Sequence, residues 1–274
     1  MATPIIAIIP SAYKEGVLAA VLPNNGIADL DFTRGSTARR INAQGLIEEV
    51  GVNIPRLDYS DGNCPSLLLE PQSTNLVIYS EDFNNTDWVK QSGITITTNT
   101  TDTLSPSGEN NANKVVSTDS TKGFYIIPVS TTNDVTRTIY LKGSVGGESV
   151  VFKDGSGFGG SVTHTLTTEW VRYEFKTTND GNIYKGFFID DISVGTIYAW
   201  GAQLEEQSFA TSYIPNYGTA EGITRLEDSA SLDLTPFNIT SIIETIDGVE
   251  QPPITTIPTI YNVPIGRVNK ILMY

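Results

Sequence analysis

The chain is poor in the two residue types that most often hold a small fold together through covalent or metal bonds. Its 274 residues include one cysteine, Cys64, and one histidine, His164. A single cysteine cannot form a disulfide within the chain, and a zinc site needs several cysteines or histidines. The sequence therefore predicts a fold that is stabilised by packing and assembly, without a cofactor.

Long hydrophobic runs are also missing. No stretch of about 18 apolar residues, the length that a membrane-spanning helix needs, occurs in the sequence. The opening residues MATPIIAIIPSAYKEG include a short apolar group, but Pro4 and Pro10 interrupt it and no basic region precedes it. We therefore expect neither a membrane partner nor a secretion signal.

Charge is sparse and mostly of one sign. Charged residues make up 18% of the chain, with 17 basic against 31 acidic residues and a formal net charge of -14. A surface of this sign repels phosphate backbones, so we expect no nucleic-acid partner. The same charge also favours solubility and resistance to self-association.

What the chain does contain favours β structure. It is 39% hydrophobic and 9% aromatic, which is enough for one sizeable core and leaves room for arms or a small second unit. Threonine, serine, asparagine and glycine are abundant, a composition typical of strands joined by polar turns. We expect an all-β protein with very little helix.

The middle of the chain, residues 75–207, is a series of short strand-like segments separated by turn clusters. The predicted strands are Lys114–Ser117, Gly123–Val129, Arg137–Leu141, Glu148–Lys153, Ser161–Thr165, Trp170–Thr177, Tyr184–Ile189 and Thr196–Gln203. Glycine-containing turns at 146–147, 154–155 and 180–181 connect several of them. About eight strands at this spacing predict an antiparallel two-sheet β-sandwich of the jelly-roll type.

Alternation is clearest in the segments WVRYEFK and RTIYLKG. In the first, Val171, Tyr173 and Phe175 are expected to face the core, with Trp170 outward. In the second, Ile139 and Leu141 are expected to point inward, with Tyr140 outward.

Two blocks bracket this region: PRLDYSDGNCPSLLLEPQSTNLVIYSEDFNNTDW, residues 55–88, and TIYAWGAQLEEQSFATSYIPNYGTA, residues 196–220. Both resemble segments of structural proteins of tailed bacteriophages, in which an attachment region leads into a lectin-like sandwich. The text from Thr74 to Ser117 also resembles the opening of jelly-roll carbohydrate-binding modules. That resemblance gives Phe83, Trp88, Gly108 and Val115 the places of the module's aromatic, tryptophan, turn and core-strand residues. It implies the fold but marks no sugar-binding residue.

Residues 1–74 are predicted to form an N-terminal virion-attachment arm. Pro10, Pro23, Pro55, Pro65 and Pro71 break any helix, and the pieces FTRGSTARRIN and GLIEEV resemble the opening of phage structural proteins. The arm's apolar residues need a partner surface, either the sandwich or a neighbouring protein; they are Ile5, Ile6, Ile8, Ile9, Val17, Leu18, Val21 and Leu22. A basic group, Arg34, Arg39 and Arg40, either pairs with acidic neighbours in an assembly or forms a solvated loop.

Residues 208–274 lose the alternation. Six prolines, at 215, 236, 252, 253, 258 and 264, force extended or turn conformations, and isoleucine and tyrosine stand between them. This segment is too hydrophobic for a solvated linker. We expect an extended C-terminal docking segment rather than a frayed tail.

Catalytic signals are absent from the sequence. There is no G-x-S-x-G, H-E-x-x-H, P-loop or dinucleotide-binding pattern, and a lone histidine such as His164 is usually structural. The glycines of DGSGFGG, at 155, 157, 159 and 160, are followed by no Lys-Ser/Thr pair and predict a hairpin loop. We expect no enzyme and name no catalytic, cofactor-binding or metal-binding residue.

Adjacent carboxylates and outward aromatics are the remaining candidates for binding. The pairs are Glu81 with Asp82, Asp190 with Asp191, and Glu205 with Glu206. Neighbours on a strand face opposite sides, so these pairs are either solvated or ligands of a structural Ca²⁺, which the module resemblance makes conceivable near the N-terminal carboxylates. Tyr140 and Trp170 either stack on sugar rings or pack structurally. The glycan-binding residues are left unknown.

The resemblance to phage structural proteins implies a structural component of a tailed-phage virion, a head fibre, capsid decoration or tail appendage. It would assemble in the host cytoplasm through its arms, contact other virion proteins and its own copies as a dimer or trimer, and display its sandwich. The alternative is a tail-tip receptor-binding protein that recognises host-surface polysaccharide.

Overall fold

The computed structural model describes residues 3–10, 18–155, 160–178 and 184–274, and this part of the chain is built from strands without a helix. The strand pairs whose register is resolved are all antiparallel. The all-β prediction is therefore confirmed. In the described ranges no helix is long and apolar enough to cross a membrane.

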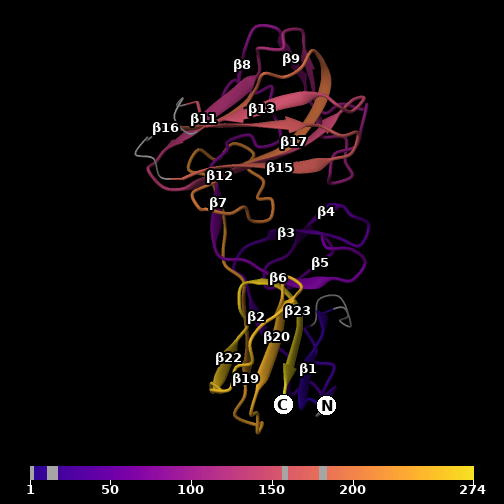
Figure 1. Ribbon diagram of the computed structural model, residues 1–274, viewed down its shortest axis with the longest axis vertical. Helices are drawn as coiled ribbons and strands as arrows, with labels where there is room; N and C mark the ends of the chain where they lie inside the picture. The colour runs from indigo at the N-terminus through magenta and orange to yellow at the C-terminus, as the bar shows by residue number, and fades with distance from the viewer. Residues whose placement is uncertain (1–2, 11–17, 156–159, 179–183) are drawn as a thin grey trace. The chain divides into compact units, whose positions relative to one another are not determined.

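The chain divides into two compact units (Figure 1). Unit 1 combines Met1–Gln72 with Arg225–Tyr274, and unit 2 is the intervening Ser73–Thr224. Unit 2 is thus encoded as an insertion in the sequence of unit 1.

Unit 2 is a β-sandwich of two five-stranded sheets. One sheet, here the β12 sheet, has the order β15 (Val171–Thr177), β12 (Val135–Gly143), β17 (Gly195–Glu205), β10 (Asn113–Ser117) and β9 (Ile94–Thr97). The other, the β16 sheet, has the order β14 (Ser161–Thr165), β13 (Ser149–Lys153), β16 (Tyr184–Asp190), β11 (Phe124–Ser130) and β8 (Val89–Lys90). The predicted antiparallel two-sheet sandwich is confirmed.

All eight predicted strands of this region are present, with ends that match or shift by at most two residues. The sequence analysis missed β8 and β9. β8 has only two residues, and β9 is an alternating Ile-Thr segment whose threonine-rich continuation has the composition of a turn. Strands this short give too few alternating positions to be separated from loops. The turn at 180–181 and Gly157 and Gly159 lie outside the described residues.

The predicted alternation holds along β12, where Ile139 and Leu141 are fully buried. On β15 Phe175 is buried, Tyr173 packs against the core, and Val171 is 37% exposed. The inward placement of Val171 was therefore wrong. It is the first residue of a strand at the edge of its sheet, where no further strand covers it.

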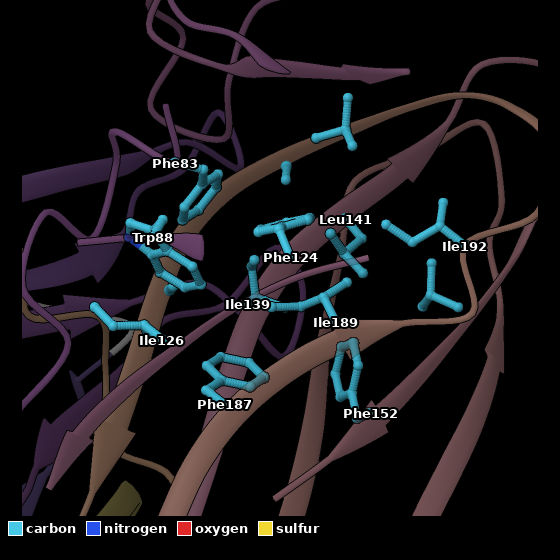
Figure 2. Packing of buried hydrophobic residues seen from close by; sticks show 14 of the residues in the cluster. Phe83, Trp88, Phe124, Ile126, Ile139, Leu141, Phe152, Phe187, Ile189 and Ile192 are labelled. Carbon is cyan, nitrogen blue, oxygen red and sulfur yellow. The ribbon is translucent and has the colours of Figure 1, made fainter. Parts of the chain in front are cut away.

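An aromatic cluster closes one part of the core of unit 2, as Figure 2 shows. The rings of Phe83 and Trp88 meet edge to face with centroids 4.9 Å apart, and both lie 5.6 Å from the ring of Phe124. Buried aromatic pairs in these geometries add about 0.5–1.5 kcal/mol each to the hydrophobic gain. Val115 is also buried, and Gly108 lies in a turn with φ +83°, so the positions that the module resemblance gave to these residues fit the packing.

Unit 2 extends beyond the predicted boundary at residue 207. The segment after β17 hydrogen-bonds back to it: Gln203 Oε1 accepts from the Ile214 N–H at 2.6 Å, and Gln203 Nε2 donates to Thr211 O at 3.4 Å. Because Tyr213 and Ile214 are buried in this way, the sandwich continues to Thr224. There β18 (Ile223–Arg225) pairs with β7 (Ser73–Asn75).

Unit 1 has its own sheets and core. Its largest sheet has the order β21 (Val249–Glu250), β20 (Ile242–Ile246), β23 (Gly266–Met273), β6 (Ser66–Leu69) and β5 (Arg56–Asp58), with β1 (Ile6–Ile8) also on β23. A three-stranded sheet has the order β2 (Asp31–Thr33), β19 (Ser229–Asp233) and β22 (Ile260–Asn262). β3 (Ala38–Ile41) and β4 (Ile47–Val50) form a hairpin.

The two expected arms are instead halves of one unit. β1 pairs with β23 in the register Ile6↔Met273 and Ile8↔Ile271, and all four side chains are fully buried. For Ile6 and Ile8 the partner surface is therefore the C-terminal segment of the same chain, whereas Ile5, Val21 and Leu22 of the same apolar set are exposed. This pairing could not be predicted from the sequence, because β1 has only three residues and frequent prolines interrupt the alternation around it. Val17 lies outside the described residues.

The basic group of unit 1 pairs with carboxylates of the same unit. Arg39 lies 3.1 Å from Glu49, and Arg40 lies 2.6 Å from Glu48 across the β3–β4 hairpin. Arg34 is buried and donates to Asp228 at 3.0 Å. Of the two alternatives for these arginines, the structure supports pairing with acidic neighbours. Those neighbours belong to the same chain.

Arg34 belongs to a buried ionic cluster, defined here as Arg34, Arg56, Glu70, Arg225 and Asp228. Arg56 contacts both carboxylates, Glu70 at 2.8 Å and Asp228 at a shorter distance, and Arg225 lies 3.4 Å from Glu70. The charge of the neighbouring carboxylates raises the pKa of Arg56 although burial opposes it. Buried charges are tolerated only when they are paired in this way, so the cluster fixes both halves of unit 1 to each other.

Candidate functional site

The candidate site is a solvent-facing cleft in unit 2, here called the tyrosine cleft. It has a volume of about 350 Å³ and is lined by Tyr79, Glu81, Asp82, Asn99, Asn111 and Tyr217. Tyr217 is 65% exposed, so the cleft opens to solvent. The volume lies at the lower end of the range of small-ligand sites, about 300–1,000 Å³.

Loops from four parts of the chain build this cleft. Tyr79, Glu81 and Asp82 lie in the turns that lead from the buried Val77 to the aromatic core, and Tyr217 lies in the segment that follows β17. Asn99 follows β9 and Asn111 precedes β10. Loops held by a rigid sandwich are the usual place for binding residues, because the strands fix the loop ends while the loop side chains remain accessible.

The carboxylate of Glu81 accepts hydrogen bonds from three side chains at the cleft. Its Oε1 accepts hydrogen bonds from Tyr213 Oη at 2.9 Å and Tyr217 Oη at 3.2 Å, and its Oε2 accepts from Asn111 Nδ2 at 3.0 Å. Hydrogen bonds to an ionised carboxylate are stronger than those between neutral groups. Glu81 therefore fixes the orientation of the side chains on both sides of it.

Tyr213 contacts the Glu81 carboxylate from the buried interior of unit 2. Its ring packs against Trp200 with centroids 4.6 Å apart, and its hydroxyl is hydrogen-bonded to Ser80 at 2.7 Å. Burial, together with the charge of Glu81, raises the pKa of Tyr213 well above its usual value. The hydroxyl therefore stays protonated at neutral pH and remains a donor to Glu81.

A glycine in β17 makes room for this packing. Gly201 has φ +65°, and a Cβ built there would meet the rings of Tyr140 and Tyr213 at 3.4 Å. The pairing of β12 with β17 shifts register next to it, between Thr138 and Tyr140. A bulge with glycine in the left-handed conformation re-aims neighbouring side chains, and here it brings Trp200 against Tyr213.

Two residues of the cleft hold strained backbone conformations. Tyr79 has φ +54° and Asn99 has φ +53°. Asparagine tolerates this left-handed region, but a bulky tyrosine rarely adopts it, at a cost of about 1–3 kcal/mol. Gly218 lies against the Tyr79 ring, since a Cβ at Gly218 would come within 3.1 Å of it. Strain that persists in this way often marks a functional surface.

The outward aromatics that the sequence singled out do not line the cleft. Tyr140 packs against Trp200 with centroids 5.6 Å apart, and the Arg172 guanidinium lies 5.6 Å above its ring. Trp170 Nε1 donates to Leu104 O at 2.8 Å. Of the two readings given to Tyr140 and Trp170, the contacts support structural packing.

The three adjacent carboxylate pairs lie in different environments. Glu81 and Asp82 both line the cleft. Asp190 and Asp191 both accept from Lys153 Nζ, at 2.9 and 2.7 Å, and form an ion-paired group at the surface of the β16 sheet. Lys153 supplies the opposite charge for both carboxylates.

Glu205 and Glu206 also have protein partners. Glu205 is buried and accepts from the Ser73 hydroxyl at 2.5 Å and from the Thr211 N–H at 3.0 Å, while Glu206 accepts from Asn133 Nδ2 at 3.0 Å. Within the described ranges, no three histidine, cysteine, aspartate or glutamate side chains come together in a geometry that could hold a metal ion. The structural Ca²⁺ remains a prediction.

His164 lies between aromatic rings. Its ring is 4.7 Å from that of Phe152 and 4.8 Å from that of Tyr173, and its buried Nε2 makes no hydrogen bond. Burial lowers its pKa below the usual value of 6.5. The surroundings are those of a packed structural histidine. Cys64 is exposed with a free thiol.

Sequence analysis missed four lining residues of the cleft: Tyr79, Asn99, Asn111 and Tyr217. A signal for the two tyrosines was present, because Tyr79 lies in the first of the two sequence blocks and Tyr217 in the second. The structure brings these blocks to one cleft, where Glu81 of the first accepts from Tyr213 and Tyr217 of the second.

No known family's sequence profile matches this chain, and no curated protein sequence matches it either. Solved structures do show likenesses. The CBM22-1 xylan-binding domain from Paenibacillus barcinonensis is 13% identical over 52% of this chain and 99% of that domain, with a TM-score of 0.39. The carbohydrate-binding module CBM6cm-2 from Cellvibrio mixtus lichenase 5A, solved with cellotriose, is 17% identical over 51% and 99%, with a TM-score of 0.31.

A phage protein is also among the similar structures. The enzymatically active domain of tailspike protein 4 from bacteriophage CBA120 is 16% identical over 47% of this chain, with a TM-score of 0.33. This chain covers 21% of that structure. These figures describe likenesses in β-rich fold and nothing more specific.

Proposed function

We propose that unit 2 binds a saccharide in the tyrosine cleft. The observation that carries this proposal is the placement of two tyrosine rings, the exposed Tyr217 and the half-buried Tyr79, beside carboxylate and amide side chains in one open cleft. The apolar faces of sugar rings stack on aromatic side chains, and their hydroxyls need closely placed polar partners. The volume of about 350 Å³ suits one or two sugar units.

The preorganisation of the cleft supports the same function. Glu81 holds Tyr217 and Asn111 in place through its two oxygens, and Gly218 lets the Tyr79 ring lie close to the backbone. Side chains that are fixed before the ligand arrives lose little conformational entropy on binding, which raises affinity.

Binding of the full-length protein to a broad panel of polysaccharides, measured by affinity electrophoresis and calorimetry, tests this proposal. We expect Tyr217→Ala to weaken saccharide binding at least tenfold, since alanine truncation of an aromatic anchor at a binding site typically has effects of this size, about 1.4 kcal/mol or more. Phe209→Ala is the matched control, because Phe209 is an exposed aromatic of unit 2 outside the cleft. Absence of saccharide binding, or equal losses in both variants, would refute the proposal.

A second proposal concerns the place of the chain in a particle. We infer that it is a structural component of a tailed-phage virion, a head-fibre, capsid-decoration or appendage protein that displays unit 2. The resemblance of residues 55–88 and 196–220 to phage structural proteins supports this, and so does the separate core of unit 1, which could attach while unit 2 is displayed. A tail-tip protein that recognises host-surface polysaccharide would combine the two proposals.

The expected neighbours are other virion proteins and further copies of this chain in a dimer or trimer, assembled in the host cytoplasm. Immunogold electron microscopy of intact particles, with antibody against residues 73–224, tests the location. Gold over the capsid supports a head fibre or decoration, gold at the tail tip supports receptor recognition, and unlabelled particles would contradict display. Light scattering that gives a monomer at high concentration would contradict the oligomer.

A further inference from the structure

The Glu81 carboxylate engages several of the hydrogen-bond donors at the tyrosine cleft. Two donors of the cleft, Asn111 Nδ2 and the Tyr217 hydroxyl, are directed at Glu81. A third, the Tyr213 hydroxyl, reaches Glu81 from the interior. These donors are therefore already engaged when a ligand arrives.

The lining also offers an acceptor to a ligand. Asp82 contributes a partly exposed carboxylate that accepts one local hydrogen bond, from the Asn84 N–H at 3.2 Å. An ionised carboxylate has acceptor capacity only, so it can take hydrogen bonds from sugar hydroxyls.

The charge of the lining has one sign. The six lining residues include two carboxylates and neither a lysine nor an arginine, and the whole chain carries a formal net charge of -14. Carboxylate, sulfate and phosphate groups are recognised in proteins by arginine, lysine or groups of free N–H donors. An anionic sugar would therefore lose its hydration in the cleft, meet like charge and find no cationic side chain among the lining residues.

We propose that the tyrosine cleft takes a hydroxyl-rich saccharide without anionic groups and excludes saccharides that carry carboxylate, sulfate or phosphate. This inference rests on the proposed function, because it assigns the ligand class of the same cleft. In the bound state the sugar hydroxyls donate to Asp82 while a ring face lies against the exposed Tyr217.

Paired polysaccharides that differ only in acidic groups test the inference on the full-length protein. Dextran is compared with dextran sulfate, and galactan with polygalacturonate, within a panel that also covers neutral xylan, glucan and mannan. We expect binding to at least one neutral polymer and at least tenfold weaker binding to anionic ones. Because screening by salt weakens exposed charge repulsion, the difference should shrink as ionic strength rises toward about 1 M.

One variant locates the exclusion in the cleft. Asp82→Asn keeps the shape but removes one negative charge, so the preference for neutral over anionic polymer should fall about fivefold, the factor for two charges about 4 Å apart in a water-like dielectric. Asp87→Asn, an exposed aspartate of the same loop region that does not line the cleft, is the control and should leave the preference unchanged.

The outcomes separate this inference from the proposed function. If anionic polymer binds as tightly as neutral polymer, and Tyr217→Ala abolishes that binding, the proposed ligand class is wrong. The proposal that the cleft binds a saccharide would still stand. Failure of every polymer, neutral and anionic, would overturn both. If Asp82→Asn prefers neutral over anionic polymer as strongly as the unmodified protein does, the negative charge of the cleft is not the cause of the exclusion.

Discussion

The hydroxyl of Tyr213 lies 2.9 Å from Oε1 of Glu81 and joins the buried interior of unit 2 to the tyrosine cleft. The ring that carries this hydroxyl packs on Trp200, which is 2% exposed, so a core contact determines where a cleft carboxylate points. The geometry of the tyrosine cleft and the packing of the core are therefore coupled through one side chain.

Tyr213→Phe tests this coupling. The substitution keeps the ring and removes the donor, so Glu81 loses a hydrogen bond to its charged form. We expect unit 2 to lose about 1.5–3 kcal/mol of unfolding free energy, the usual range for hydrogen bonds to charged groups, and saccharide affinity to fall. Urea unfolding followed by tryptophan fluorescence measures the stability. Tyr217→Phe is the control, because its hydroxyl is exposed and its loss should cost much less; equal losses would contradict the assignment.

The ionic cluster of unit 1 makes a second prediction. Asp228→Ala removes a buried carboxylate that pairs with Arg34 and Arg56, leaving their charges buried with fewer partners. We expect about 3–5 kcal/mol of destabilisation, as for other broken buried pairs. Hydrogen exchange should show the loss of protection in residues 1–72 and 225–274.

The control for this variant is Glu49→Ala. Glu49 pairs with Arg39 on the surface, where an ion pair contributes about 0–1 kcal/mol. A destabilisation of unit 1 by Asp228→Ala no larger than that of Glu49→Ala would show that the cluster is unimportant for stability.

The third prediction is that unit 2, residues 73–224, folds when it is separated from the rest of the chain. Residues 73–224 contain every member of the aromatic and aliphatic core of unit 2, and their ends meet in the pairing of β7 with β18, where the Thr74 and Thr224 hydroxyls lie 2.8 Å apart. A segment with adjacent ends and its own core should fold alone. We expect cooperative unfolding and native near-ultraviolet circular dichroism.

Removal of residues 1–74 gives the matching comparison. Because β23 loses β1 and β6, residues 225–274 should unfold, while most of unit 2 keeps its structure. An excised 73–224 segment that aggregates or unfolds without cooperativity would contradict the independence of unit 2.

His164 gives a prediction for pH. Burial lowers its pKa in the folded protein below the ordinary 6.5, so in mildly acidic solution the unfolded chain binds a proton that the folded chain does not. The stabilising contribution is complete above about pH 6.5 and is lost as pH falls through the lowered pKa. Urea unfolding of unit 2 between pH 7.5 and 4.5, in steps of about 0.5, follows this loss.

A variant isolates the histidine from the carboxylates that titrate in the same range. His164→Gln cannot gain a proton and should show a shallower fall in stability below pH 6.5 than the unmodified protein. Identical pH profiles for the two proteins would exclude His164 as the source.

Much of unit 2 could be predicted from the sequence, because its signals are local. Ile139 and Leu141 alternate with polar neighbours within one strand, and such alternation fixes both the strand and its buried face. The same reasoning placed Val171 inward, and it failed there because strand position in the sheet, rather than alternation, decides exposure at an edge.

Unit 1 and the tyrosine cleft required the tertiary structure, because their partners are far apart along the chain. Ile6 meets Met273, and Glu81 meets Tyr213 across 132 positions. No periodicity spans such distances. The sequence by itself determined an all-β chain with a jelly-roll core and without a visible catalytic motif. Only the fold decided that its two ends form one unit and that its tyrosines, amides and carboxylates share a cleft, since long-range strand pairing is set by the packing of the whole chain.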